Sequence, residues 1–415
     1  MNIFFYDFSI KYDGTSLNTK PLGGSQTALI YISIELAKRG NNVFVFNLCE
    51  KEEKYDGVIY IPVKRLNDYF KVISCDVFVS LRGASIFNNN IPAKLKILWA
   101  HDSIAQGVEA IVKELYDKKI SCNIDKIFTV SLWQTLSFID EFKIPAEKFF
   151  IARNGVNLKL FESAEATQKE NRFIYTSTPF RGLDILVKKI WPRLKVILPD
   201  YRLSIFSGMK VYQYDNSKEK DIFKDIYDTI KSDDKINFFG NVTQMQLSAE
   251  LLKHKMYLYP NTFEETSCIA LMESMAACVP IVSTRLGALP ETTMQHAALI
   301  DKNPYSEEYA DEFINKVLFL LNNDGEYARM QKNAREKILK WNDWNDIGEE
   351  WNLELNYLIG NSKDVLNKFP ARRALEYLSA GKKNLARKIL NDLPQNEIED
   401  IFIRYPHLTL NKMEF

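Results

Sequence analysis

The sequence predicts an α/β protein made of two halves in which strands and helices alternate, followed by a helical tail. The chain has 415 residues, which is too long for one ordinary hydrophobic core. Short apolar runs, typical of parallel strands buried on both faces, alternate with helical patterns. We expect two Rossmann-like domains at 1–161 and 162–345, a helix at 346–361 that could pack back on the first domain, and a helical tail at 362–415.

The first half contains a series of apolar runs that we interpret as strands. A helix follows the first run, because Leu29, Ile32 and Leu36 share one helical face and Gly40 is a plausible C-cap. The expected strands are 3–8, 43–47, 76–81, 96–100, 126–130 and 149–152.

A polar stretch at 157–172 interrupts the series, and we interpret it as a linker. The expected strands of the second half are 173–175, 202–206, 236–239, 256–259, 280–283 and 297–300. Ligands of such sheets bind outside the carboxyl ends of the strands. Two facing halves would therefore place a ligand in the cleft between them.

The pattern changes beyond about residue 361. Segments 371–378 and 385–393 predict a helical hairpin around Gly381. The hairpin could support a homo-oligomer or be a degenerate helical repeat, and the simpler alternative is a tail packed on the main body.

Composition excludes several classes of protein. The formal net charge is zero, so no basic footprint for nucleic acid is visible. The five cysteines are dispersed and the four histidines lie far apart, which argues against a disulfide framework and against a zinc site. The N-terminus does not have the pattern of a signal peptide, and no apolar run is long enough to span a bilayer. We therefore expect a cytoplasmic protein.

The segment 259–280, YPNTFEETSCIALMESMAACVP, carries the strongest chemical signal. A strand ends near Pro260, and a helix is expected to begin near Ser267. The amides of the first helical turn would be free to bind a diphosphate. Glu265 precedes the helix and Glu273 lies about two turns inside it, so both carboxylates could bind sugar hydroxyls. Alternatively, both glutamates are solvated on an amphipathic helix.

Three weaker signals also follow predicted strands. Gly23-Gly24 lies at the start of the first helix, where glycine lets a phosphate approach the backbone. Arg181 precedes Gly182 at a strand–helix junction and could bind a diphosphate bidentately. His101 follows the strand 96–100. Each feature alone also has a structural explanation, whereas together they indicate one site.

With these residues in place, the sequence resembles the retaining glycosyltransferase family 4, which has the GT-B fold of two facing Rossmann-like domains. The resemblance covers roughly residues 1–350. Glu265 to Glu273 matches the E-x7-E motif of that family, and ESMAACVPIVST matches the stretch that follows the motif. Further counterparts are Gly23-Gly24, His101, Ser131 and the turn Asn154-Gly155-Val156.

The resemblance implies a role for each matching residue. Glu273 would bind the ribose hydroxyls, and Glu265 would lie near the donor hexose. The amides of 266–269 would contact the sugar and the diphosphate. Val242 would lie near the base, and His101 near the transferred sugar. The implied donor-binding residues are Gly23, Gly24, Ser131, Asn154, Ser177, Arg181, Val242, Glu265, Thr266, Ser267, Cys268, Ile269 and Glu273.

The sequence departs from the family pattern at the diphosphate. The family commonly has an arginine and, further on, a lysine. Here Ser177 stands roughly where the arginine would be, so Arg181 must take the role of the lysine.

The implied reaction is transfer of a hexose or N-acetylhexosamine from a nucleotide diphosphate sugar to a saccharide or glycoconjugate acceptor, with retention. The expected catalytic residues are His101, Arg181 and Glu265. No cofactor is expected, and no metal, because no DxD pair follows a strand. The alternatives are a GT-B nucleotide-sugar epimerase and a non-catalytic nucleotide-sugar-binding or scaffold protein. The base, the donor sugar and the acceptor remain open.

One basic segment could also touch a membrane. The sequence VKKIWPRLKVIL at 187–198 carries Trp191 among basic residues and could bind weakly to an anionic surface. The alternative is an ordinary helix of the second domain.

Overall fold

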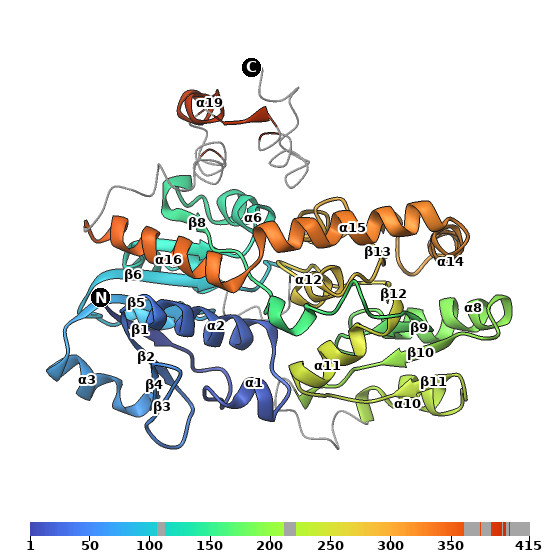
Figure 1. The fold of residues 1–415 in the computed structure, drawn as a ribbon. Helices are drawn as coiled ribbons and strands as arrows, with labels where there is room; N and C mark the ends of the chain where they lie inside the picture. Colours follow the sequence, from blue (N-terminus) through green and yellow to red (C-terminus); the bar gives the residue numbers. More distant parts are fainter. Residues whose placement is uncertain are drawn as a thin grey trace. The chain divides into compact units, whose positions relative to one another are not determined.

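The computed structural model describes residues 1–105, 113–210 and 221–360, together with residues 374, 383–391, 393–395 and 398 of the tail (Figure 1). Close contacts divide the chain into two compact units. The first unit consists of Met1–Thr15, Ser25–Asn154 and the described residues from Trp344 onward, and the second consists of Ser16–Gly24 and Gly155–Asp343.

The first unit is built on an eight-stranded sheet with the order β3-β4-β2-β1-β5-β6-β7-β8. Its neighbouring strands are parallel, except that β3 and β4 pair antiparallel. The strands are β1 (Asn2–Tyr6), β2 (Asn42–Asn47), β3 (Glu53–Tyr55), β4 (Val58–Pro62), β5 (Cys75–Leu81), β6 (Ala93–Ala100), β7 (Lys126–Thr129) and β8 (Phe149–Ile151).

Helices flank this sheet. The longer ones carry apolar faces that are buried, as expected for helices that cover a parallel sheet. They are α2 (Gly24–Lys38), α3 (Leu66–Val72), α5 (Lys118–Cys122), α6 (Leu132–Phe142) and α16 (Trp344–Leu358), with short 3-10 turns η1 (Val63–Arg65), η2 (Ser85–Asn88), η3 (Glu114–Tyr116) and η4 (Ala146–Lys148). A further helix, α19 (Lys383–Asn391), belongs to the tail.

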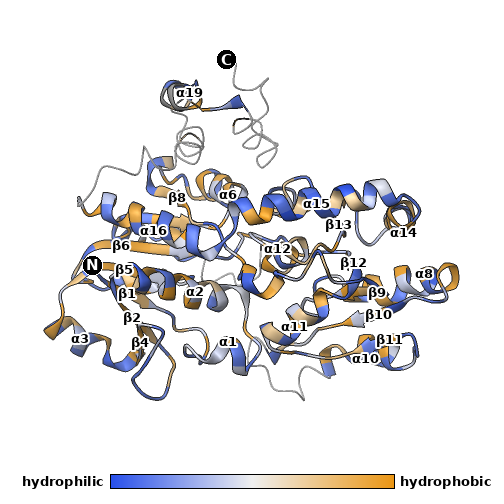
Figure 2. Cartoon of the chain, in the orientation of Figure 1, coloured by the Kyte–Doolittle hydropathy of each residue, from blue (hydrophilic) through white to orange (hydrophobic). Residues whose placement is uncertain are grey.

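The core of the first unit is rich in aromatic side chains because its strands are apolar along both faces. Figure 2 shows β6 as largely hydrophobic. Trp351 of α16 is fully buried, and its ring lies 4.7 Å from that of Trp99 and 4.9 Å from that of Phe128. The helix that follows the second unit in sequence is therefore part of the core of the first unit.

The second unit is built on a six-stranded, fully parallel sheet with the order β11-β10-β9-β12-β13-β14. Parallel strands bring their carboxyl ends to one edge. The strands are β9 (Glu170–Tyr175), β10 (Arg202–Ile205), β11 (Ile236–Phe238), β12 (His254–Tyr259), β13 (Ile281–Thr284) and β14 (Ala298–Ile300).

The helices of the second unit pack around one large apolar core. The long, mostly hydrophilic α15 is visible in Figure 2. The helices and helical turns of the second unit are α1 (Ser16–Thr19), η5 (Leu158–Phe161), α7 (Leu183–Ile185), the π-turn η6 (Leu186–Ile190), α8 (Trp191–Ile197), α10 (Lys224–Lys231), α11 (Gln244–Leu251), α12 (Ile269–Ala276), α13 (Leu289–Thr292), α14 (Glu307–Leu321) and α15 (Asp324–Trp341).

The chain enters and leaves the second unit at adjacent points. The Val156 amide donates to the Asn342 carbonyl at 2.7 Å, and Val156 also pairs with Asp343. The change between units therefore falls at 154/155 and 343/344, whereas the sequence placed it at 161/162 and 345/346. Of the tail, α19 is described, and the expected helix at 371–378 lies almost entirely outside the described residues.

The linker expected at 157–172 is wrong at both ends. Residues Leu158–Phe161 form η5, and Phe161 is fully buried. β9 begins at Glu170, inside the expected linker. The first residues of the strand are polar and exposed, so they look like linker, while its last three are buried. β3 and β4 were not predicted.

The basic segment 187–198 is a core helix. Ile190, Trp191 and Leu194 are fully buried, and the Trp191 indole donates to the Asp233 carboxylate at 3.1 Å. Lys195 donates to the same carboxylate at 2.6 Å. Trp191 and its apolar neighbours are therefore packed inside the unit, whereas Val196 and Ile197 at the end of the segment are exposed. Among the described residues, no helix is both long and apolar enough to cross a bilayer.

Candidate functional site

The site in the second unit begins where β12 ends. Tyr259 closes the strand, and the loop after it leads to α12, which begins at Ile269 rather than near Ser267 as the sequence suggested. Cys268 is the N-cap with extended backbone, φ −88° and ψ 96°, and this conformation delays the helix. The first turn still directs backbone amides toward the loop, as at any helix N-terminus.

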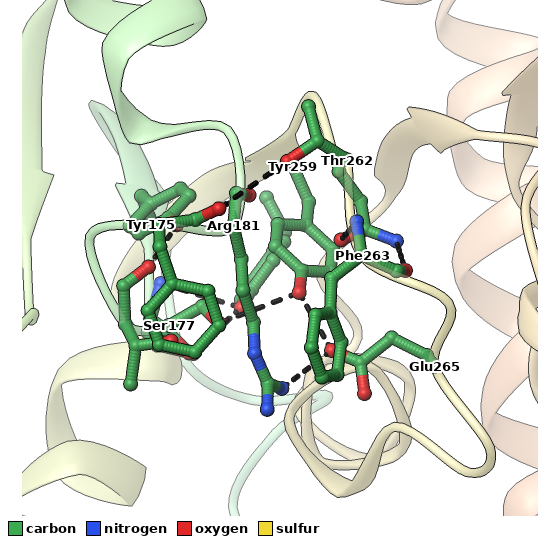
Figure 3. Close-up of polar contacts among 12 residues, drawn as sticks. Tyr175, Ser177, Arg181, Tyr259, Thr262, Phe263 and Glu265 are labelled. Carbon is green, nitrogen blue, oxygen red and sulfur yellow. Dashed lines mark hydrogen bonds and ion pairs between the residues drawn. The ribbon is translucent and has the colours of Figure 1, made fainter. Parts of the chain in front are cut away.

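Glu265 lies in this loop and is buried, with 6% of its surface exposed. Its Oε1 atom accepts two hydrogen bonds of 2.7 Å, one from Arg181 Nη1 and one from Tyr259 Oη. Figure 3 shows the guanidinium and the phenol converging on this carboxylate. The interpretation of Glu265 as a solvated surface residue is therefore wrong, because burial requires the charge to be paired.

Arg181 is held by aromatic rings as well as by Glu265. Its Cζ atom lies 4.0 Å from the centroid of the Phe263 ring and 5.5 Å from that of Phe180. The loop that carries Arg181 is anchored by Tyr175, whose hydroxyl donates to the Thr178 carbonyl at 2.9 Å. The guanidinium is thus oriented before any ligand arrives, which favours recognition of an anion.

Two glycines let neighbouring segments approach the loop closely. Gly182 has φ +90°, and a Cβ added there would lie 1.9 Å from the Pro260 carbonyl oxygen. Gly287 has φ +58°, and its Cβ would lie 2.6 Å from the Glu265 carbonyl oxygen. The Ala288 amide donates to that same oxygen at 2.7 Å. Glycine is required at both positions to fix the backbone of Glu265 and Arg181.

Glu273 lies on α12 and is also buried, with 5% of its surface exposed. Its Oε1 atom accepts a 2.8 Å hydrogen bond from Gln244 Nε2 at the start of α11. Burial raises the pKa of Glu273 to about 7, although the Gln244 hydrogen bond opposes the rise. A buried carboxyl with so raised a pKa and one neutral partner is typical of a ligand-binding group.

The other predicted residues of this unit lie around the same loop and α11. The Ser177 hydroxyl is 3.3 Å from Tyr259 Oη. Thr266 is buried, and Ser267 Oγ is buried without a hydrogen-bond partner among the described residues. Val242 is half-buried against the core, two residues before Gln244.

The glycine pair lies at the start of α2, as predicted. The helix begins at Gly24, and both glycines cluster with the second unit. A Cβ on Gly24 would lie 3.5 Å from Ile269 Cδ1, which is ordinary van der Waals contact. Gly24 therefore faces the first residue of α12.

In the first unit, His101 directly follows β6. Its ring lies 4.7 Å from that of Trp99. Burial, assisted by the nearby Arg82 charge, lowers the pKa of His101 to about 3. The imidazole is therefore neutral at physiological pH, so it can exchange hydrogen bonds but carries no positive charge.

Asp102 anchors the residues after β6. Arg82 binds its carboxylate bidentately, with two hydrogen bonds of 2.8 Å. Gln134 Nε2 donates to the Asp102 carbonyl at 2.9 Å. A pocket beside these residues is lined by Arg82, Leu98, Ala100, His101, Asp102, Leu115 and Phe138.

Ser131 and Asn154, two further predicted donor contacts, also belong to the first unit. Ser131 is the N-cap of α6, and its hydroxyl accepts from the Gln134 amide at 3.1 Å. Asn154 is buried just beyond β8. The structure gives Ser131 a capping role and leaves its predicted donor contact as a prediction.

Sequence reasoning missed Tyr259, Phe263, Gln244 and Gly287. Tyr259 and Phe263 lie inside the motif but were taken as strand and loop residues, and Gln244 lies two residues after the FFGNV segment. The contacts of Phe263 with Arg181 and of Gln244 with Glu273 join residues far apart in sequence, so no local signal marks them. Tyr259 lies only six residues before Glu265, and its place in the strand gave no sign of this hydrogen bond. Among the described residues, no group of three His, Cys, Asp or Glu side chains could hold a metal ion.

Comparisons with known proteins find similarity to glycosyltransferases. Residues 161–337 match the family model described as Glycosyl transferases group 1. The match lies within the second unit, which is thus similar to a group 1 glycosyltransferase domain. A curated relative, the MMP α-(1→4)-mannosyltransferase of Mycolicibacterium hassiacum, is 24% identical over 56% of this chain and 54% of its own length. The chain thus spans about half the length of this relative.

Solved structures show the fold over most of the chain. The sucrose-phosphate synthase of Thermosynechococcus elongatus aligns with a TM-score of 0.69 and 15% identity, over 87% of this chain and 100% of that one. Anabaena HepE, in complex with UDP and glucose, aligns with a TM-score of 0.63 and 14% identity, over 86% and 100% of the two chains. The chain therefore has the GT-B fold that the sequence predicted.

Proposed function

We propose that this protein is a retaining glycosyltransferase that moves a hexose or N-acetylhexosamine from a nucleotide diphosphate sugar to a saccharide or glycoconjugate acceptor. The observation that carries the proposal is the pair of buried carboxylates around α12. Glu265 is paired with Arg181 in the loop before the helix, and Glu273 lies about one turn inside the helix with a raised pKa.

The nucleotide side of the proposal rests on Glu273. A carboxylate that is buried and bonded only through one oxygen to a neutral amide has acceptor capacity left for a diol. The ribose hydroxyls of a nucleotide provide such a diol. Val242, two residues before Gln244, would then lie near the base through its backbone.

The leaving-group side rests on Arg181 and the α12 N-terminus. Departure of the diphosphate builds negative charge, and a preorganised guanidinium and helix amides stabilise such charge. The Glu265 carboxylate already accepts two hydrogen bonds at Oε1, which lowers its nucleophilicity. Glu265 therefore orients Arg181 and contacts the sugar rather than forming a covalent intermediate. His101 would lie near the transferred sugar as a neutral group, and we expect no requirement for a divalent metal.

A thermal-shift screen of UDP-, GDP- and ADP-sugars tests the proposal. A donor at a hundred times its Kd adds about 2.7 kcal/mol to the free energy of unfolding. We expect one donor to raise the Tm and to be slowly hydrolysed, and Glu273→Ala to abolish both effects. Hydrolysis that persists in the presence of a chelator would support metal-independent chemistry, whereas loss of hydrolysis would indicate a requirement for a divalent metal. No shift with any donor would contradict the proposal, and binding without turnover over a broad acceptor panel would indicate a binding protein.

A further inference from the structure

Arg181 is the only strongly basic residue that the proposed function assigns to the diphosphate, yet it is already paired. Its side chain is 18% exposed and that of Glu265 is 8% exposed. Water screens such a pair little, so Glu265 neutralises much of the charge that a diphosphate would attract. Arg181 must share its guanidinium between the carboxylate and the ligand. Two neighbours make this sharing possible.

The first neighbour is Tyr259. Its hydroxyl donates to the same Oε1 atom of Glu265 that accepts from Arg181. The Tyr259 ring is fully buried at the end of β12, so the hydroxyl has a fixed position. Burial, and then the Glu265 charge, raise the pKa of Tyr259, which keeps the phenol protonated as a donor. The carboxylate therefore keeps a hydrogen bond when Arg181 turns toward a ligand.

The second neighbour is Phe263. Its ring centroid lies 4.0 Å from Arg181 Cζ, within the range of a cation–π contact. Figure 3 shows the ring beside the guanidinium, close to Glu265. A planar guanidinium can rest on a ring face and still present its edge to a phosphate, whereas an ammonium group has no such plane. This geometry explains why an arginine suits a position where the resembled family commonly has lysine.

We propose that Tyr259 and Phe263 are positioning residues for the leaving group: Tyr259 holds the Glu265 carboxylate while Arg181, supported on the Phe263 ring, shares its guanidinium with the donor diphosphate. The proposal rests on the proposed function and deepens it. It concerns the terminal phosphate of the nucleotide, because Arg181 acts there and not on the base or ribose.

The test compares nucleotides with and without that phosphate. Binding of UDP and UMP, or of GDP and GMP where the unsubstituted chain prefers guanosine, is measured by calorimetry. Tyr259→Phe removes one hydroxyl. Tyr257→Phe is the matched control, because Tyr257 is equally buried in β12 but its hydroxyl bonds Thr176 at 2.7 Å. Phe263→Leu removes the ring from a half-buried position and gives an independent test.

We expect Tyr259→Phe and Phe263→Leu each to weaken diphosphate binding about tenfold while monophosphate binding stays unchanged. The control should change neither. In turnover, Tyr259→Phe should lower kcat with little change in the donor KM, because the shared contact strengthens as the diphosphate departs.

If Tyr259→Phe and Phe263→Leu leave the ratio of diphosphate to monophosphate affinity unchanged, whether or not both affinities fall, this proposal is overturned while the proposed function stays in place. Absence of nucleotide binding by the unsubstituted chain would overturn both. If Tyr259→Phe unfolds at a lower temperature than Tyr257→Phe, the ratio of diphosphate to monophosphate affinity in Phe263→Leu decides whether the proposal holds.

Discussion

Two glutamates eight positions apart have different physical states. Glu265 accepts hydrogen bonds from an arginine and a phenol, whereas Glu273 accepts one from a neutral amide. The pKa of Glu273 is consequently raised from 4.5 to about 7. Keeping such a group costs stability, which is common where binding requires a buried charge. In the first unit, burial likewise favours the neutral form of His101 and lowers its pKa to about 3.

The stability cost of Glu273 predicts a pH-dependent effect of Glu273→Gln. Between pH 4.5 and about 7 the folded chain holds this proton more tightly than the unfolded chain, so stability falls as pH rises and the penalty is complete above pH 7. The variant should therefore be more stable than the parent by on the order of 2 kcal/mol at pH 8 and nearly equal at pH 4.5.

Thermal unfolding of the unliganded proteins across this pH range measures the difference. Glu336→Gln, at an exposed position on α15, should show no such trend. A parent that remains the more stable protein at pH 8 would contradict the raised pKa.

At the scale of elements, the site depends on how closely three loops approach one another. The loop between β12 and α12 lies against the backbone of Gly182 on one side and Gly287 on the other. Both glycines have positive φ, and neither leaves space for a Cβ. The position of Arg181 relative to Glu265 is thus set by backbone contacts as well as by their ion pair.

A comparison of two glycine variants separates close approach from backbone strain. Gly240 also has positive φ, at +67°, but nothing lies within 4 Å of an added Cβ. Gly240→Ala should cost about 1 kcal/mol through strain alone. Gly182→Ala adds a clash with the Pro260 carbonyl and should cost more than about 3 kcal/mol, with loss of donor binding.

Urea unfolding and nucleotide binding of the two variants check this expectation. Equal destabilisation by both substitutions would show that the loop can yield, and that the contact at Gly182 does not hold the site.

At the scale of the whole molecule, the chain leaves the first unit after Asn154 and returns to it at Trp344. The returning helix α16 contributes Trp351 to the first core and brings Gly348 against Glu35 of α2, where a Cβ would lie 2.4 Å from Glu35 Cβ. The first unit therefore requires residues from both ends of the sequence, and a deletion after Asp343 would remove part of its core.

Trp351→Ala should destabilise the first unit by about 3–5 kcal/mol, the usual cost of removing a buried aromatic side chain. The second unit contains no part of this core. Its unfolding transition, recognised because nucleotide raises its Tm, should therefore keep the same Tm in the variant. Differential scanning calorimetry with and without nucleotide distinguishes the unfolding transitions of the two units. Tyr357→Ala, at the exposed end of the same helix, serves as control. A uniform fall of one cooperative transition would contradict independent unfolding.

Much of the fold follows from local pattern. The apolar strands of both halves were predictable because parallel strands buried on both faces are nearly continuous apolar runs. β3 and β4 escaped prediction because β3 is short and polar, and the linker was overestimated because β9 begins with exposed polar residues. β3 is an edge strand, whereas the missed part of β9 is the exposed start of a central strand.

The sequence by itself determined the two-unit α/β architecture and the positions of Glu265, Glu273, Arg181 and Gly24 beside strand or helix ends, because these depend on spacing along the chain. Only the tertiary structure decided that both glutamates are buried, that Tyr259 and Arg181 share one oxygen of Glu265, and that Gln244 bonds Glu273. Arg181 and Gln244 lie far in sequence from the glutamates that they contact, and burial and pKa depend on everything that surrounds a group in three dimensions.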